Sequence, residues 1–142
     1  MRRDEIMAVV ARWEDAMIRR DAVGMISNYA PDCVVESPFA GGPVTGRDAN
    51  EQICRAWFTA FADVDTHFEE LLIDDNRVML IAMVVGTDSG GFMGLAPTGK
   101  PFRCPVVFLL TLNEEHQIAH EKRIYDFTGV LVQIGVLKAK PA

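Results

Sequence analysis

Cysteine is scarce in this sequence, and its placement excludes two kinds of site. The chain has three cysteines, Cys33, Cys54 and Cys104, which are far apart and form no Cys-x-x-Cys pair. Neither a disulfide framework nor a cysteine-rich zinc site fits an odd number at these spacings. Free thiols are typical of a reducing compartment, so we predict a cytoplasmic protein.

Positive charge and long apolar runs are also in short supply. The chain has 14 lysines and arginines against 20 acidic residues, a net charge of −6. This balance argues against a nucleic-acid partner and against docking on an acidic membrane surface, because both require basic residues. The longest apolar run, Val78–Val85, is too short to span a bilayer. Arg2 and Arg3 near the N-terminus are followed at once by Asp4 and Glu5, which is not the pattern of a signal peptide.

What the sequence does contain fits one soluble globular domain. Hydrophobic residues make up 49% of the chain and charged residues 24%, which is typical of globular proteins. A length of 142 residues is enough for one domain with a real core and too short for two ordinary ones. We therefore expect a single domain over residues 1–142.

Three helices are predicted in the first half of the chain. The first has one apolar face, a second runs from a cap at Asp21 to Tyr29 before Pro31, and a third starts at an Asp48–Glu51 capping box. The expected buried residues are Ile6, Val9, Val10, Trp13 and Met17, then Val23, Ile26 and Ala30, then Ile53, Ala56, Trp57, Ala60 and Phe61.

The rest of the chain has the period of two that is typical of strands. After a short piece at Cys33–Ser37 and a loop at Pro38–Thr45, we expect strands at Val64–Ile73, Arg77–Thr87, Pro101–Leu112 and Gln117–Phe127. Gly90–Gly99 is predicted to be a loop that forms a mobile rim over a pocket, and Lys138–Ala142 a frayed tail.

Two predicted strand stretches, Arg77–Thr87 and Cys104–Leu112, are apolar on both faces, and this has a consequence for assembly. In Arg77–Thr87 both alternating sets of side chains are apolar, so both faces must be covered. Three helices can cover only one face, and a large bare apolar patch is rare on a monomer. The other face then needs a partner chain or the C-terminal tail to cover it, and we predict a homodimer through the outer sheet face.

Two segments carry a resemblance to a known family. Phe92–Lys100 resembles the loop of SnoaL-like polyketide cyclases, and Asp126–Gly135 is similar to their C-terminal signature. That family belongs with nuclear transport factor 2 and the ketosteroid isomerases. The resemblance implies an α+β fold: a cone-shaped, curved, mostly antiparallel sheet wrapped around three N-terminal helices, with one apolar pocket and a short C-terminal tail.

The residues at the family's catalytic places differ in this chain. Aligned on Asp126-Phe127-x-Gly129, the carboxylate base of the cyclases falls on Arg123 and their pocket histidine near Leu109. Asp126 matches another family carboxylate, and we expect it to be either a cap or a salt-bridge group at the entry to the tail. The resemblance to ketosteroid isomerases places Ser37 where they have a catalytic aspartate, and the acid of limonene epoxide hydrolases also falls on Arg123.

The candidate catalytic residues are Arg123, Tyr125 and His67. The expected ligand-binding residues are Trp13, Tyr29, Trp57, Phe61, Met93, Leu109 and Glu121. Glu121 and Arg123 share a strand face and could pair either in the pocket or at the surface. His116 and His120 are four residues apart, but in a turn and strand they do not converge on a metal, so we predict neither metal nor cofactor.

Three functions remain open. The first is a metal-independent enzyme of the isomerase, cyclase or hydrolase type that acts on a hydrophobic ring or polyketide-like compound. In it Arg123 would stabilise an enolate or bind a carboxylate, and Tyr125 or His67 would move a proton. The second is a non-catalytic protein that binds a hydrophobic ligand, and the third is a protein-interaction module.

Overall fold

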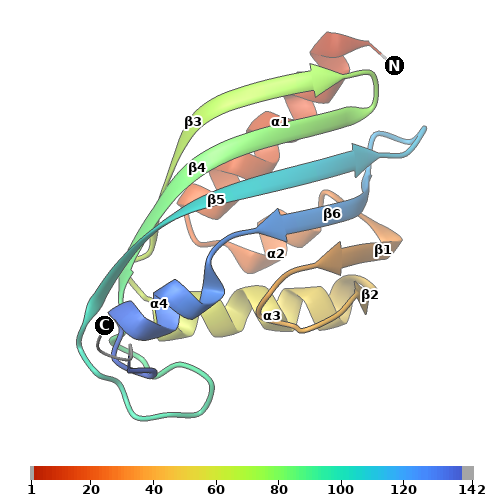
Figure 1. Cartoon of the computed structure of the whole chain (residues 1–142). Coiled ribbons are helices and arrows are strands. Elements are labelled where there is room, and N and C mark those ends of the chain that lie inside the picture. The colour runs from red at the N-terminus through yellow and green to blue at the C-terminus, as the bar shows by residue number, and fades with distance from the viewer. Residues whose placement is uncertain (1, 139–142) are drawn as a thin grey trace.

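The computed structural model describes residues 2–138, and it confirms an α+β fold built on one curved sheet. The six strands have the order β2-β1-β6-β5-β4-β3, and every neighbouring pair is antiparallel except β1 and β6. Helices α1, α2 and α3 lie behind the sheet in the view of Figure 1. The elements are α1 (Arg3–Ile18), α2 (Ala22–Ile26), β1 (Tyr29–Glu36), β2 (Val44–Thr45), α3 (Arg47–Ala60), β3 (Asp65–Asp74), β4 (Arg77–Thr87), β5 (Pro101–Leu112), β6 (Ile118–Ile124) and α4 (Phe127–Gln133).

Helix α1 buries the face that its sequence period predicts. All the residues expected to face the core are buried, and Trp13 is fully enclosed. The spacing of these residues places them on one stripe of a 3.6-residue helix, which packs against the inner side of the sheet.

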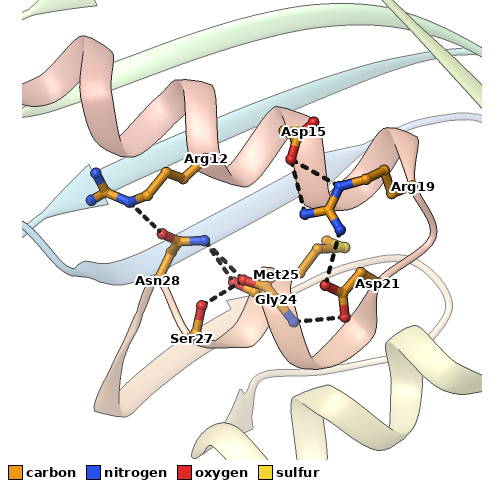
Figure 2. Close-up of polar contacts among 8 residues, drawn as sticks. All are labelled: Arg12, Asp15, Arg19, Asp21, Gly24, Met25, Ser27 and Asn28. Carbon is orange, nitrogen blue, oxygen red and sulfur yellow. Dashed lines mark hydrogen bonds and ion pairs between the residues drawn. The ribbon is translucent and has the colours of Figure 1, made fainter.

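The corner between α1 and α2 is held by polar contacts (Figure 2). The Asp21 carboxylate accepts a hydrogen bond from the Gly24 amide at 2.9 Å, which confirms the predicted cap. Arg19 lies between Asp15 at 2.9 Å and Asp21 at 3.6 Å. The Asn28 side-chain amide donates to the Gly24 carbonyl at 3.0 Å. In a longer helix, that carbonyl would have accepted a hydrogen bond from a backbone N–H one turn later.

Helix α2 is therefore shorter than predicted and faces the core differently. It ends at Ile26, and strand β1 already begins at Tyr29. Pro31 lies inside β1, where the register with β6 shifts and no ladder bond needs its missing N–H. The expectation that Val23 faces inward is wrong, because its side chain is exposed.

Helix α3 begins one residue before the predicted capping box. Its N-cap is Gly46, with φ at 95°, and no side chain caps it, so the Asp48–Glu51 box is wrong. The inward stripe follows Asn50, Cys54 and Ala60, whereas Ala56 is exposed. Two residues along a helix turn the side chain by about 200°, so Ala56 points away when Cys54 points inward.

The outer face of the sheet carries half-buried apolar side chains. On β4, Leu80 and Ala82 are buried on the inner side, whereas Ile81 and Met83 point outward. Ile81 is paired with Val107 of β5, so the outward apolar positions are side by side. Within residues 2–138, no helix is long and apolar enough to cross a membrane.

The loop between β4 and β5 is anchored, in contrast to the mobile rim expected from its glycines. Asp88 is fully buried, and its carboxylate accepts hydrogen bonds from the Gly91 amide at 3.2 Å and from the Thr98 amide and hydroxyl at 3.1 Å. Phe92 is also buried and packs on Trp57, with ring centroids 5.1 Å apart. The loop thus contributes to the core.

The segment predicted as a short tail contains a helix. Strand β6 ends at Ile124 instead of Phe127, and α4 follows, capped by the Asp126 carboxylate on the Gly129 amide at 2.9 Å. This confirms Asp126 as a cap. Gly129 has no side chain to collide with that carboxylate. Of the tail expected to fray, residues 139–142 lie outside the described part of the chain.

Candidate functional site

The helices and the inner face of the sheet enclose a cavity of about 80 Å³. Its walls come from α1, α2, α3, β3 to β6 and α4, so every layer of the fold contributes to it. Most of the lining is apolar: Met17, Met25, Trp57, Phe58, Val64, Val84, Phe102, Val106, Phe108 and Val130. The polar or thiol-bearing lining residues are Ser37, Cys54, Thr66, Cys104, Arg123 and Tyr125.

The strongest polar feature of the cavity comes from the end of β6. Alternate strand residues share one face, so Glu121, Arg123 and Tyr125 all point to the inner side. Arg123 and Tyr125 line the cavity, whereas Glu121 is fully buried and does not line it. The Arg123 Nε group donates to Glu121, and Arg123 Nη2 lies 3.4 Å from Glu121 Oε1.

The Glu121 carboxylate is also contacted by Tyr29, whose own hydroxyl is contacted by Trp13. The Tyr29 hydroxyl donates a hydrogen bond to Glu121 Oε1, and Trp13 Nε1 donates to the Tyr29 oxygen at 2.9 Å. Trp13, Tyr29 and Glu121 are all fully buried. The carboxylate therefore has donors on both oxygens, and the alternative of a surface pair between Glu121 and Arg123 is wrong.

The electrostatics keep Arg123 charged and both tyrosines protonated. Burial is the largest single influence on the pKa of Arg123 and lowers it. The charge of Glu121, with added contributions from Cys54, Tyr29 and the Glu121 hydrogen bond, together outweighs burial, so the net shift of the pKa is well upward. Burial raises the pKa of Tyr29 well above its usual value, and the Glu121 charge adds to this. Burial also raises the pKa of Tyr125, against the opposing effect of Arg123. Near neutral pH the cavity wall therefore contains a charged guanidinium, that of Arg123, and a protonated phenol, that of Tyr125.

Two thiols line the cavity as well. Burial raises the pKa of Cys54 and of Cys104, although the charge of Arg123 partly offsets this for Cys54. A thiol with a raised pKa is a weak nucleophile at neutral pH. These cysteines therefore act as small apolar wall groups beside Arg123.

Comparisons with known proteins identify the family. A profile of the SnoaL-like polyketide cyclases matches residues 7–134. The chain belongs to this family. A comparison with functionally curated proteins finds no match.

Solved structures of SnoaL-like and related proteins share the fold. AclR, a proposed hydroxylase from Streptomyces galilaeus, is 25% identical with a TM-score of 0.82, over 97% of this chain and 85% of AclR. A proposed SnoaL-like polyketide cyclase from Jannaschia sp. CCS1 is 20% identical with a TM-score of 0.84, over 97% of this chain and 94% of that one. IdmH, a proposed polyketide cyclase from Streptomyces antibioticus, is 22% identical with a TM-score of 0.76, over 92% of this chain and 98% of IdmH.

In this SnoaL-like chain, only some of the residues that the sequence predicts to be catalytic or ligand-binding line the cavity. Arg123, Tyr125 and Trp57 line it. Trp13, Tyr29 and Glu121 form the hydrogen-bonded chain next to it. Phe61 is buried among aromatic rings, 5.2 Å from Trp57 between ring centroids, and does not line the cavity.

Three predicted residues lie away from the cavity. His67 is on the outer side of β3, with a side chain that is 67% exposed and an Nε2 2.9 Å from Asp65. Leu109 follows the inward Phe108 on β5 and therefore faces outward. Met93 is exposed in the loop, at a φ of 56°. None of the three is among the lining residues.

The other two histidines are engaged elsewhere and do not converge. His116 Nε2 lies 3.0 Å from Glu5, and His120 Nε2 lies 2.7 Å from Glu36. Among residues 2–138, no group of three side chains is arranged to hold a metal ion.

Sequence reasoning missed several lining residues that a simple signal could have found. Phe102, Cys104, Val106 and Phe108 alternate along β5 and all line the cavity. Their spacing of two puts them on one face, but both faces of β5 are apolar, so the sequence does not say which one is inward. Met17 and Met25 were predictable only as core residues.

Proposed function

We propose that this protein is a metal-independent enzyme of the isomerase, cyclase or hydrolase type that binds a hydrophobic ring compound, such as a polyketide-like one, in the cavity. The observation that carries this proposal is the pairing of Arg123 and Tyr125 on one wall of a cavity that is otherwise mostly apolar. Membership of the SnoaL-like polyketide cyclase family supports a small-molecule ligand. The similarity to AclR, a proposed hydroxylase at 25% identity, is consistent with an enzyme.

The chemistry that suits this wall is stabilisation of negative charge on an oxygen. Glu121 already accepts from Tyr29 and Arg123, so it is engaged in holding the guanidinium and is not placed as a base. Arg123 would polarise a carbonyl or ring oxygen of the ligand, and the charge that develops there would be shared with its N–H groups. Tyr125 would donate its phenolic hydrogen to the same oxygen, since its raised pKa keeps it protonated.

The cavity requires some adjustment to admit a ring. Its volume of about 80 Å³ is small, whereas ligand sites usually have roughly 300 Å³ or more. Met17 and Met25 line it, and methionine side chains change rotamer at little cost. We expect these two side chains to swing aside when a ligand binds.

The test is a turnover screen with cyclic ketones and polyketide-derived aromatic ketones, followed by mass spectrometry. For a compound that the native protein converts, Arg123→Lys should reduce kcat/KM by about 100-fold because the guanidinium is aimed at the developing charge. Tyr125→Phe should reduce it by about tenfold or more. Arg55→Lys makes the same exchange in an ion pair with Glu51 on α3 and should leave turnover unchanged. Unchanged turnover in Arg123→Lys would refute the assignment.

A specific observation also favours a protein that binds without catalysis. Among the described residues that line the cavity, none is a carboxylate or an imidazole. A ligand that raises the melting temperature but is recovered unchanged after long incubation with the native protein would establish this second function.

We further propose that the protein forms a homodimer through the outer face of the sheet. Met79, Ile81, Val107 and Leu109 form an apolar block on that face, because Ile81 is paired with Val107 and Met79 with Leu109. Val107→Lys should convert the dimer to a monomer in sedimentation velocity. Val23→Lys, at an exposed position on α2, is the matched control and should leave the dimer intact. A native protein that sediments as a monomer would refute the proposal.

A further inference from the structure

Ser37 is a residue of the cavity wall that follows β1 and lies beside Arg123 of β6. The two strands run parallel, and their register pairs Val35 with Glu121. Two residues further along both strands, the same register brings Ser37 beside Arg123. Alternate residues of a strand share a face, so Ser37 is on the inner side with Val35, which is buried. Its place among the lining residues of the cavity agrees with this.

The Ser37 hydroxyl is available to bind a ligand. Ser37 Oγ accepts one long hydrogen bond, from the Ala40 amide at 3.4 Å. Within residues 2–138, the structure shows no acceptor for the hydrogen of this hydroxyl. A hydroxyl group rotates to suit its partner and can both donate and accept. The Ser37 side chain can therefore bond to either a carbonyl oxygen or a hydroxyl group of a ligand in the cavity.

Arg123 supplies a second donor on the same wall. Its Nε and Nη2 groups are engaged with Glu121, whereas Nη1 makes no hydrogen bond with any residue in 2–138. The pairing with Glu121, two residues earlier on the same strand face, keeps the guanidinium close to the sheet. Its carbon lies 5.8 Å from the centre of the Phe108 ring on β5, the strand on the other side of β6. Ser37 and Arg123 are thus neighbouring donors on the inner face of adjacent strands.

We propose that Ser37 determines specificity by binding a second oxygen of the ring compound whose first oxygen contacts Arg123 and Tyr125. This rests on the proposed function of the cavity as a ligand site. Neighbouring strands are about 4.8 Å apart, so the two donors are separated by a similar distance on one wall. Two oxygens in meta positions of a six-membered ring match this spacing and point to the same side. Oxygens in ortho positions are too close together, and oxygens in para positions point in opposite directions. The ligand class is therefore a ring with two oxygens in meta positions.

The test compares three small probes: phenol, resorcinol with its hydroxyls in meta positions, and hydroquinone with its hydroxyls in para positions. Their dissociation constants are measured by NMR titration of the isotope-labelled protein in oxygen-free buffer. We expect resorcinol to bind about fivefold more tightly than hydroquinone, which is what one net hydrogen bond between neutral groups supplies. In Ser37→Ala the two isomers should bind equally while phenol binds as before. Ser37→Thr keeps a hydroxyl and should retain the preference for resorcinol.

Two further variants test whether the position of the hydroxyl matters. Thr66→Val removes the other aliphatic hydroxyl of the lining, which is on β3 and three strands away from β6, so the preference for resorcinol should persist. Ser89→Ala makes the same exchange as Ser37→Ala at an exposed loop position outside the cavity and should leave all three affinities unchanged. Loss of the preference in Thr66→Val would refute the assignment to Ser37.

A variant that fills the cavity separates this proposal from the proposed function. Val106→Phe should abolish binding of every probe, with Val84→Met as the milder variant if the first does not fold. If phenol binds and Val106→Phe removes it, but resorcinol is not preferred or Ser37→Ala leaves the preference intact, the Ser37 proposal is wrong and the cavity proposal stands. If none of the three probes binds to the native protein, both proposals fail.

Discussion

Replacement of Glu121 by glutamine tests whether the buried ion pair organises the site. Glu121 is fully buried, and three donor groups reach its two oxygens: the Tyr29 hydroxyl and two nitrogens of Arg123. An amide presents only one acceptor oxygen. Its NH₂ group would therefore face at least one of these donors, and the Arg123 charge would lose its counter-charge.

The expected cost is about 3 kcal/mol. Removal of one partner from a buried ion pair typically costs about 3–5 kcal/mol, because the remaining charge stays desolvated. The Arg123 side chain retains 15% exposure, so some solvation remains and the lower end of the range applies. With a urea m-value on the order of 2 kcal/mol per molar, the unfolding midpoint should fall by about 1.5 M.

The measurement is urea unfolding followed by circular dichroism. Asp15→Asn is the matched control, because it removes a carboxylate from a pair with Arg19 whose side chains are 57% and 64% exposed. It should cost less than about 0.5 kcal/mol. The double variant Glu121→Gln, Arg123→Met removes both buried charges and should recover most of the stability lost in the single variant.

A small effect would refute this reasoning. If Glu121→Gln costs no more than Asp15→Asn, the pair is not desolvated in solution. Arg123 would then be free to leave the cavity wall, and its proposed role at the ligand would lose its structural basis.

Three further predictions concern other parts of the molecule. The only two tyrosines, Tyr29 and Tyr125, have raised pKa values, so neither should ionise in the folded protein near pH 10. Since they ionise first in the unfolded chain, stability should fall by about 2.7 kcal/mol per pH unit above pH 10, and absorbance at 295 nm should rise only on unfolding. Gradual ionisation without unfolding would contradict this. Gly90→Ala should destabilise the fold by about 2 kcal/mol or more, because a Cβ there overlaps the Thr59 carbonyl. Gly42→Ala, with no atom within 4 Å of the new Cβ, is its control, and equal melting temperatures would refute the argument. The three buried thiols should react with Ellman's reagent at pH 8 only after urea is added, and rapid reaction of the native protein would show that the cavity opens.

The fold was predictable because its main elements follow simple periods. The α1 stripe and the strands β3, β4 and β5 appear in the sequence at nearly their observed bounds. The errors lie where side chains make particular contacts with the backbone. Asn28 ends α2 early, and Asp126 starts a helix that apolar spacing alone does not reveal.

The site was less predictable, because a cavity depends on which strand face is inward. Glu121, Arg123 and Tyr125 share one face of the last strand, but the opposite face also carries polar residues, so the sequence left open which face is inward. In the structure the face of Glu121 and Arg123 points inward. Leu109 lies outward on a strand stretch that is apolar on both faces, so its direction was not marked. His67 shares the polar outer face of β3 with Asp65, and that spacing could have indicated its outward direction. In the hydrogen-bonded series from Trp13 through Tyr29 to Glu121, the bond between Tyr29 and Glu121 joins residues 92 positions apart, and no local pattern could have shown it.

Arg123 depends on its buried partners Glu121, Tyr29 and Trp13 for its charge to be stable in the cavity wall. This dependence limits how the residue at position 123 can differ between this chain and its relatives. The resemblance to the polyketide cyclases places their carboxylate base at position 123. An arginine in that position on its own would be a desolvated charge in an apolar cavity, which is strongly unfavourable. Here Glu121 neutralises it on the same strand face, Tyr29 donates to the Glu121 oxygen that the Arg123 Nε group does not contact, and Trp13 in turn donates to the Tyr29 oxygen. The charge at 123 therefore depends on residues from α1, β1 and β6 together. A carboxylate at 123 beside an unchanged Glu121 would place two like charges in that enclosure, so neither arrangement converts to the other by one substitution.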